Sequence, residues 1–379
     1  MYLANTVLQL LVYCPPFREL FGDLGRLQGQ RERGVTDGSV TPLVDATVKF
    51  LDELAYKEKP PWTHQHLQQV ARSKAREDED GKEEDDSVQS TYVYDAMKEK
   101  RQFIVMRDDQ QQDAAAFLDL YLNALDEELV TLRSSISTHK PASALKVEEL
   151  KEETSSGGAQ TEVGERGYTT SSVKSPISRI FGGKSRSTVR APNQPDSVTF
   201  QDWRLLQLNI QPDSVQTIQD SLVHISQPQP LKAGQPSSIE ASQQVTLEAL
   251  PPILVLHLER FLYDGTADGI VKISKPIQFA PELEISLGVM TPVAGKSAEL
   301  VNYKLCGVLY HHGESANGGH YTIDVLHQSE DSGSEEAWLH IDDEGVNAVR
   351  HEDVFGGRDS EQLDDRCVYM LFYCRTAPV

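Results

Sequence analysis

The chain has 379 residues, 39% of them hydrophobic, enough for one large globular domain or two to three ordinary ones. Its 58 acidic residues against 36 basic ones give a formal net charge of -22, which argues against a nucleic-acid partner and favours a basic protein or peptide. Its four cysteines show no Cys-x-x-Cys spacing, so we predict neither a disulfide framework nor a thiolate zinc site. This cysteine pattern is typical of a reducing compartment, the cytoplasm or the nucleus.

The opening segment, MYLANTVLQLLVYCPPF, predicts a helix because its apolar residues from Leu3 to Cys14 follow helical spacing. We expect this helix to stop at Pro15-Pro16, since proline lacks the amide hydrogen that continues a helix. The apolar run is too short to cross a bilayer and no basic stretch precedes it. We therefore predict no signal peptide and no membrane partner.

Two further helices are indicated in the first third of the chain. Thr41 and Pro42 are typical of an N-cap and a first helical position, and apolar residues repeat at helical spacing from Asp113 to about Leu132. Residues 1-133 are therefore predicted to form a helical subdomain, interrupted by an acidic loop at 72-90.

The composition changes after this helical part. Residues 134-175 are rich in Ser, Thr, Gly, Glu and Lys, which predicts a disordered insertion. Beyond it the apolar period becomes two, which predicts strands at 207-210, 245-250, 253-263, 303-312, 320-327, 337-342 and 367-374. Helices followed by antiparallel strands indicate an α+β fold, with a cleft where the two parts meet.

His320 and Asp342 stand at the ends of two consecutive predicted strands. If these strands form a hairpin centred near Asp331, residues 320 and 342 lie opposite each other, with an imidazole beside a carboxylate. Such a carboxylate orients the histidine, so that its second nitrogen can take a proton from a nucleophile. A shift in register would make Asp343 the partner instead. From spacing alone, the pair is equally a plain cross-strand contact.

A metal site is the weaker alternative in this region. His311, His312, His320 and Asp342 offer ligand atoms, but no His-x-x-x-His spacing or clustered carboxylates accompany them. We predict no metal and no cofactor.

Six segments match the motif order of one known family. They are ANTVLQLLVYCPPF, QQDAAAFL, LPPILVLHLERF, GGHYTIDV, WLHIDD and CVYMLFY, and together they resemble the catalytic domain of the ubiquitin-specific proteases. The details VYCPPF and IFGG are most similar to the subgroup of ubiquitin carboxyl-terminal hydrolase 10 and its fungal counterparts. The resemblance implies a papain-like α+β hand that grips ubiquitin, with a helical thumb, β fingers at 176-250 and an antiparallel β palm at 251-379.

The resemblance also implies a reaction, thiol-dependent hydrolysis of the bond after ubiquitin's C-terminal glycine. His320 would be the general base, Asp342 its orienting acid and Asp343 a polar neighbour. The substrate partner would be ubiquitin or a ubiquitinated protein, bound by a monomer. The family's Gln-Asp-Ala signature continues here with Ala116 in place of a glutamate, which would weaken a contact to the ubiquitin tail. The residues near that tail would be Gln112, Asp113, Gly318, Gly319 and Tyr321, although Tyr321 is equally a strand core residue.

One departure from the family affects the nucleophile. Alignment through Asn5 and Gln9 places the family's cysteine position on Tyr2, whose phenol, with a pKa of about 10, cannot replace a thiolate. We therefore expect the chain as written to be inactive. One explanation is a gene model that begins too late, which would also omit the oxyanion-stabilising loop. The others are a ubiquitin-binding pseudoenzyme and, least favoured, an unrelated scaffold or metal-dependent hydrolase.

The remaining cysteines are not predicted to replace the nucleophile. Cys14 lies at the C-terminal end of the first helix, roughly 18 Å from residue 2, whereas reactive thiols favour helix N-termini. We predict that it packs at the helix end and that Cys306, Cys367 and Cys374 are buried structural thiols.

Overall fold

The computed structural model describes residues 2–31, 40–57, 91–98, 100, 102–103, 113–138, 175–231, 241–264, 269–292, 300–313, 319–327, 336–343, 345–355 and 366–376. The predicted acidic loop at 72–90 lies outside these residues, as does most of the predicted insertion at 134–175. Within them the helices are α1 (Tyr2–Val12), α2 (Pro15–Arg31), α3 (Pro42–Lys57), α5 (Thr91–Lys98), α6 (Ala114–Thr138), α7 (Pro176–Phe181), α8 (Ile218–Ser226) and α9 (His351–Phe355).

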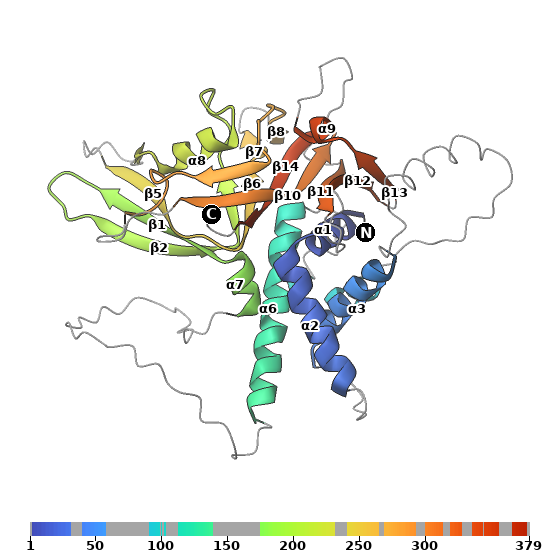
Figure 1. The fold of residues 1–379 in the computed structure, drawn as a ribbon. Coiled ribbons are helices and arrows are strands. Elements are labelled where there is room, and N and C mark those ends of the chain that lie inside the picture. The colour runs from blue at the N-terminus through green and yellow to red at the C-terminus, as the bar shows by residue number, and fades with distance from the viewer. Residues whose placement is uncertain are drawn as a thin grey trace, which may run out of the picture.

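The described strands form three sheets. A finger sheet has the order β2-β1-β5-β4, a palm sheet has the order β13-β12-β11-β10-β14-β6-β3 with β9 paired to β10, and β7 pairs with β8. Figure 1 shows the finger sheet extending to one side and the long helices α2 and α6 pointing downward from the palm. The strands are β1 (Gly183–Arg190), β2 (Ser197–Trp203), β3 (Leu205–Leu208), β4 (Gln229–Pro230), β5 (Ser242–Ala249), β6 (Ile253–Leu258), β7 (Phe261–Asp264), β8 (Gly269–Lys272), β9 (Glu282–Ile285), β10 (Val301–His312), β11 (His320–His327), β12 (Ala337–Asp342), β13 (Gly345–Val349) and β14 (Cys367–Arg375).

The first two helices are separated by only two residues. Pro15-Pro16 was predicted to stop the first helix, and α1 does end before it, but the same prolines are the first residues of α2. Proline is tolerated there because the first amides of a helix have no partner within the helix. The proline pair therefore begins a helix that the sequence analysis missed.

The start of α3 is held by a carboxylate from α6. α3 begins at Pro42, as predicted. The buried Glu128 side chain accepts hydrogen bonds from the amides of Leu43 at 3.2 Å and Val44 at 2.8 Å, and Lys100 Nζ lies 2.7 Å from the same carboxylate. These bonds satisfy amides that a helix leaves without partners at its N-terminus. α6 itself continues to Thr138, so the predicted thumb boundary at residue 133 falls inside a helix.

The palm strands lie close to their predicted positions, but β6 and β11 are buried on both faces rather than on alternate residues, and one strand needs a correction. β11 and β12 have the predicted bounds, but the predicted strand at 253–263 is two strands, β6 and β7. The break falls at Arg260, whose buried guanidinium donates to the carbonyls of Val368, Ile273 and Lys275 at 2.5 to 2.9 Å. The buried guanidinium thus links the break between the two strands to three carbonyls in other segments of the chain.

The finger region departs further from the prediction. β1 and β2 were not predicted, because β2 is exposed along nearly its whole length and β1 is mostly polar, so an apolar alternation is absent. β3 lies within the predicted finger range of 176–250 but pairs in parallel with β6 of the palm. Sequence order therefore does not separate fingers from palm.

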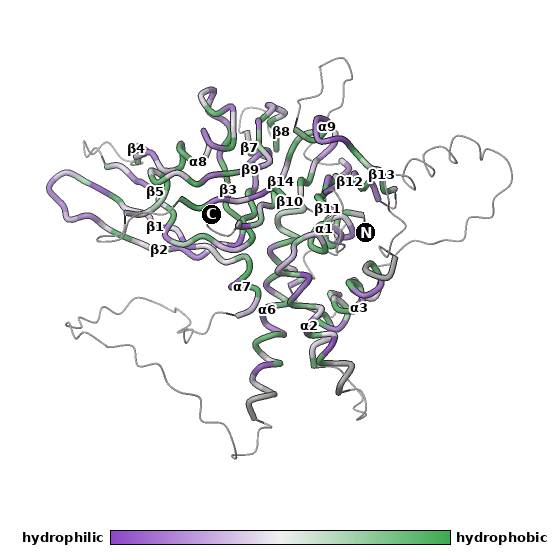
Figure 2. The backbone as a smooth tube through the Cα atoms, in the orientation of Figure 1, coloured by the Kyte–Doolittle hydropathy of each residue, from purple (hydrophilic) through white to green (hydrophobic). Residues whose placement is uncertain are grey.

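The core consists of two apolar clusters, one on each face of the palm sheet. One joins the thumb helices to the sheet and includes Leu10, Tyr121 and Ile323. The other includes Leu256 and Leu371 and is covered in part by α8. Figure 2 shows the hydrophobic stretches concentrated in α1, β10 and β14, at the centre of the molecule. α1 therefore packs against the palm sheet, which carries His320.

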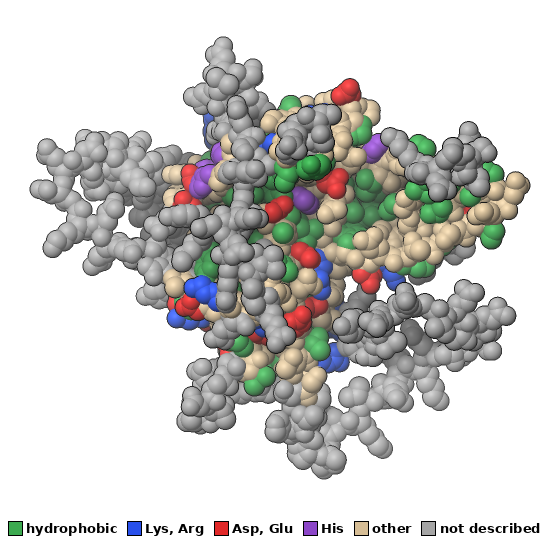
Figure 3. Space-filling view, turned by 180° about the vertical axis from the view of Figure 1, so that it is seen from behind, with side chains coloured by type: hydrophobic (Ala, Val, Ile, Leu, Met, Phe, Trp, Pro, Cys, Tyr) green, Lys and Arg blue, Asp and Glu red, His purple; other side chains and the backbone are tan. Residues whose placement is uncertain are grey.

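The surface is mixed in charge where it is described. On the face seen in Figure 3, acidic and basic side chains are interspersed and hydrophobic side chains show between them. Two acidic stretches of the sequence, residues 76–86 and 147–153, lie outside the described residues. Among the helices described, none has both the length and the apolar character needed to cross a membrane.

Candidate active site

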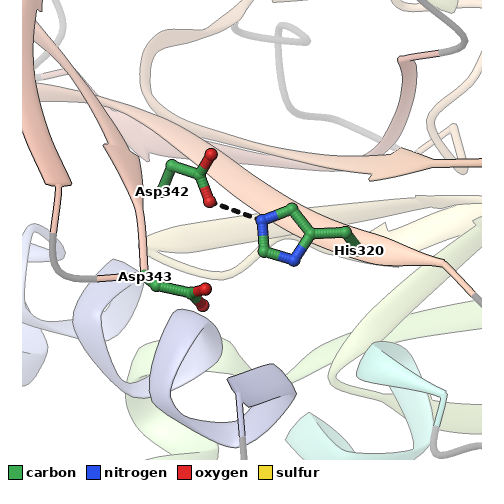
Figure 4. Close-up of side chains that lie close together, drawn as sticks. All are labelled: His320, Asp342 and Asp343. Carbon is green, nitrogen blue, oxygen red and sulfur yellow. Dashed lines mark hydrogen bonds and ion pairs between the residues drawn. The ribbon is translucent and has the colours of Figure 1, made fainter.

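The centre of the site is a contact between His320 and Asp342. His320 begins β11 and Asp342 ends β12, and His320 Nε2 is hydrogen-bonded to Asp342 Oδ1 (Figure 4). The two side chains are 40% and 51% exposed, so solvent screens their electrostatic attraction. The contact therefore serves to orient the imidazole more than to stabilise the fold.

The register of this hairpin differs from the prediction. Residues 320 and 342 were expected to lie directly opposite each other, but Ile323 pairs with Ile341. Continuing that register places Asp342 beside Thr322, so Asp342 reaches His320 on the diagonal. The prediction of direct opposition was wrong, although the two side chains still meet.

Asp343 lies beside the pair without joining it. It follows β12, and Figure 4 marks no interaction from its carboxylate to His320 or Asp342. Its Oδ1 atom is buried and has no hydrogen-bond partner among the described residues. Its backbone carbonyl accepts a hydrogen bond from Gln9 Nε2 of α1 at 3.1 Å. The alternative in which Asp343 replaces Asp342 as the partner of His320 is thus not what the structure shows.

The approach to His320 requires glycine at position 319. Gly319 has a φ of 145°, and a Cβ there would lie 2.4 Å from both His311 Nε2 and His312 O. Any side chain at this position would therefore collide with β10. Gly318, also predicted to lie near a substrate tail, is outside the described residues.

Asp113 forms the centre of a polar network at the start of α6. Its Oδ1 accepts from the amide of Ala115 and from the Tyr369 hydroxyl, both at 2.7 Å. Tyr321 is 7% exposed, and burial, together with the nearby Asp113, raises its pKa. Its ring is therefore a core element, and its role toward a substrate stays a prediction. Gln112 lies outside the described residues.

Two members of this network were missed by the sequence analysis. Tyr369 is fully buried, and its ring lies 4.8 Å from that of His257. Burial lowers the pKa of His257, while Asp113 opposes that shift. Neither residue has a local sequence signal, because aromatic and histidine residues are ordinary in strands.

His257 gives a pH-dependent prediction. Burial holds the pKa of His257 in the folded chain below its usual value of 6.5. The unfolded chain therefore binds a proton on this histidine more strongly than the folded chain does, and the fold loses stability as the pH falls through about 6.5. We expect the free energy of unfolding to drop on acidification by at most about 1.4 kcal/mol per pH unit from this group. Urea unfolding from pH 7.5 to 5.5 measures it. His257→Gln should flatten the slope and His351→Gln, at an exposed position, should not.

The four thiols lie elsewhere. Cys14 is buried at the end of α1. A contact with the Cys306 thiol lowers its pKa, but burial and Cys374 outweigh that effect and raise it. Burial and Cys14 raise the pKa of Cys306, whereas the Cys306 contact and then burial raise that of Cys374. Cys367 and Cys374 are only partly buried, so the prediction of buried structural thiols was wrong in its burial for these two.

Of the four metal ligands considered from the sequence, only His320 and Asp342 belong to the cluster that could hold a metal ion. His311 is fully buried, and His312 Nε2 is hydrogen-bonded to Thr322 Oγ1 at 2.8 Å. Among the described residues, His320, Asp342 and Asp343 offer ligand atoms that all lie within 4.8 Å of one another. The grouping coincides with the His–Asp pair, and the absence of a metal stays a prediction.

The fold and the pair together define a papain-like α+β hand in which β11 and β12 present a histidine and a carboxylate. A family model described as ubiquitin carboxyl-terminal hydrolase matches residues 2–373. The chain therefore belongs to the ubiquitin carboxyl-terminal hydrolase family.

Individual relatives agree with this assignment. The chain is 33% identical to a probable ubiquitin carboxyl-terminal hydrolase 3 of Schizosaccharomyces pombe, over 98% of this chain and 72% of that protein. It is 34% identical to ubiquitin carboxyl-terminal hydrolase 10 of Rattus norvegicus, over 98% of this chain and 46% of that protein. The chain thus spans about half the length of the rat relative.

A solved structure supports the fold alone. The Ubp8/Sgf11/Sus1/Sgf73 deubiquitinating module of SAGA bound to ubiquitin aldehyde contains a chain that matches with a TM-score of 0.63 at 18% identity, covering 100% of this chain and 68% of that one.

Proposed function

We propose that this chain is a ubiquitin-recognising domain whose family reaction is thiol-dependent deubiquitination, and that the chain as written binds ubiquitin without cleaving it. The observation that carries the proposal is the His320–Asp342 hydrogen bond at the ends of β11 and β12. Family membership and relatives named as ubiquitin carboxyl-terminal hydrolases support ubiquitin as the partner.

The dyad has a defined role in such chemistry. Asp342 accepts a hydrogen bond from the Nε2–H group of His320, which leaves Nδ1 as the base toward a thiol and, after attack, as the acid toward the leaving amine. The thiol would attack the carbonyl of ubiquitin's C-terminal glycine, forming a thioester acyl-enzyme and releasing the amine. Water would then cleave the thioester, releasing ubiquitin with a free C-terminal carboxylate and regenerating the thiol.

The nucleophile is the missing component of this scheme in the chain as given. α1 begins at Tyr2, the position that aligns with the family's cysteine. A phenol with a pKa of about 10 is almost entirely protonated at neutral pH and does not support acyl transfer here. The four cysteines contact other parts of the fold, with Sγ atoms near the carbonyls of Leu10, Phe372 and Ser274 or near another thiol. Binding without turnover follows.

A binding titration and a turnover assay on the same preparation test this proposal. We expect saturable binding of ubiquitin and no release of fluorophore from a ubiquitin C-terminal conjugate above a protein-free blank. His320→Ala, which removes the base, should leave the binding constant within about threefold. Absence of ubiquitin binding by the folded chain would refute recognition, and turnover by the chain as written would refute the assignment to Tyr2.

A further inference from the structure

The contact between Gln9 and Asp343 joins the first helix to the turn that follows β12. The apolar side of α1, including Val7 and Leu11, is buried, whereas Gln9 projects from the helix toward the turn after β12. Its Nε2 donates to the Asp343 carbonyl across a separation of 334 residues. The helix at the start of the chain is therefore bonded directly to the turn next to the dyad.

The acceptor belongs to a turn that needs support. Asp343 has a φ of 51°, in the left-handed region that non-glycine residues rarely adopt, and Asp342 pairs with Gly345 across the turn. The Asp343 side chain does not supply that support, since its Oδ1 has no hydrogen-bond partner among the described residues. A hydrogen bond to the Asp343 carbonyl fixes the orientation of that carbonyl and, with it, the end of β12.

Gln9 makes this contact from a helix that cannot easily shift. The thumb-side apolar cluster holds the buried side of α1 against the palm sheet. At the other end of the helix, the Tyr94 hydroxyl of α5 accepts from the amides of Ala4 and Asn5. The helix is therefore held in its first turn and along its buried side, so that Gln9 presents its donor from a fixed place.

We propose that Gln9 is a positioning residue for the dyad, holding the Asp342–Asp343 turn so that Asp342 keeps its hydrogen bond to His320. The proposal rests on the proposed function for the catalytic meaning of the dyad, but its geometric content is independent of ubiquitin. In this arrangement the helix that carries position 2 and the turn that carries the acid move as one unit.

Gln9→Met tests the proposal on the full chain, because methionine keeps the length of the side chain and removes only the amide. The measured quantity is the tautomer of the His320 ring. Nitrogen NMR of protein that carries isotope-labelled histidine detects it, at a pH where the histidines are neutral. His320→Gln assigns the signal. In the parent we expect one tautomer, with Nε2 protonated and bonded to Asp342.

For Gln9→Met we expect ring signals that average between the two tautomers, and amide exchange at Asp343 and Gly345 faster by about fivefold, as the loss of one hydrogen bond gives. Gln216→Met is the matched control. It removes a glutamine donor to the Asp213 carbonyl, at 2.7 Å in an exposed loop, and should leave His320 unchanged.

Two results would overturn the proposal. One is a folded Gln9→Met variant with the parent tautomer, and the other is an equal change in the Gln216→Met control. If Gln9→Met does not fold, Gln9→Glu, which keeps the shape but lacks the donor, takes its place with the same criteria. Failure of ubiquitin binding in the parent chain would count against the proposed function alone, since the tautomer is measured without ubiquitin.

Discussion

Tyr2→Cys is expected to make the chain react covalently with a ubiquitin probe that carries a C-terminal electrophile, whereas the parent chain forms no adduct. Position 2 is the first residue of α1, and a helix N-terminus lowers the pKa of a thiol and so raises its thiolate fraction. The same helix is bonded through Gln9 to the turn that adjoins His320 and Asp342. Intact-protein mass spectrometry after incubation with the probe measures the adduct.

Two controls separate this reaction from nonspecific alkylation. Leu3→Cys places a thiol one residue further along the helix, about 100° around its axis, and should not react at a comparable rate. Adding His320→Ala to Tyr2→Cys removes the base and should slow labelling by about a hundredfold or more. Equal labelling of the Tyr2→Cys and Leu3→Cys variants, or labelling that ignores His320, would contradict the assignment of position 2 as the nucleophile position.

Glu128→Ala is expected to destabilise the fold by about 3 to 5 kcal/mol. The buried carboxylate accepts the amides of Leu43 and Val44 and pairs with Lys100 Nζ. Removal of this carboxylate leaves two backbone amides at the start of α3 without an acceptor. It also leaves the Lys100 ammonium group without its counter-charge at a position largely shielded from solvent. Equilibrium unfolding in urea, followed by circular dichroism, measures the change.

The neighbouring residue supplies the control. Glu127 is exposed on the same helix, and Glu127→Ala should change the free energy of unfolding by less than about 0.5 kcal/mol. Glu128→Gln should fall between the two, since an amide oxygen still accepts one backbone amide while Lys100 loses its counter-charge. Similar losses for Glu127→Ala and Glu128→Ala would show that the contact to α3 does not carry the stability assigned to it.

Local patterns account for what was predicted correctly. β11 and β12 have the predicted bounds because each segment is rich in aromatic, β-branched and other apolar residues and a single polar loop separates them. α3 starts at Pro42, as predicted from the adjacent Thr41 and Pro42, because proline is favoured at the first helical position. The structure places His320 and Asp342 in contact, whereas the catalytic roles that the family resemblance implies for them stay predictions.

The errors fall where local patterns are ambiguous. A proline pair both ends a helix and begins one, so α2 was missed. The polar strands β1 and β2 carry no apolar alternation, so they have no local sequence signal. What makes them strands is their pairing with each other and with β5. The hairpin register was displaced because the length of a loop does not fix which residues pair across it.

The sequence by itself determined the α+β class, the family and the identity of the residue at position 2, because each of these is read from residue types and their order. Only the tertiary structure decided that Asp342 rather than Asp343 holds His320, that Gln9 bonds the Asp343 carbonyl, and that Asp113 joins Tyr369. These contacts join residues 22, 334 and 256 positions apart. Such pairings follow from how helices and sheets pack, which no short window of sequence contains.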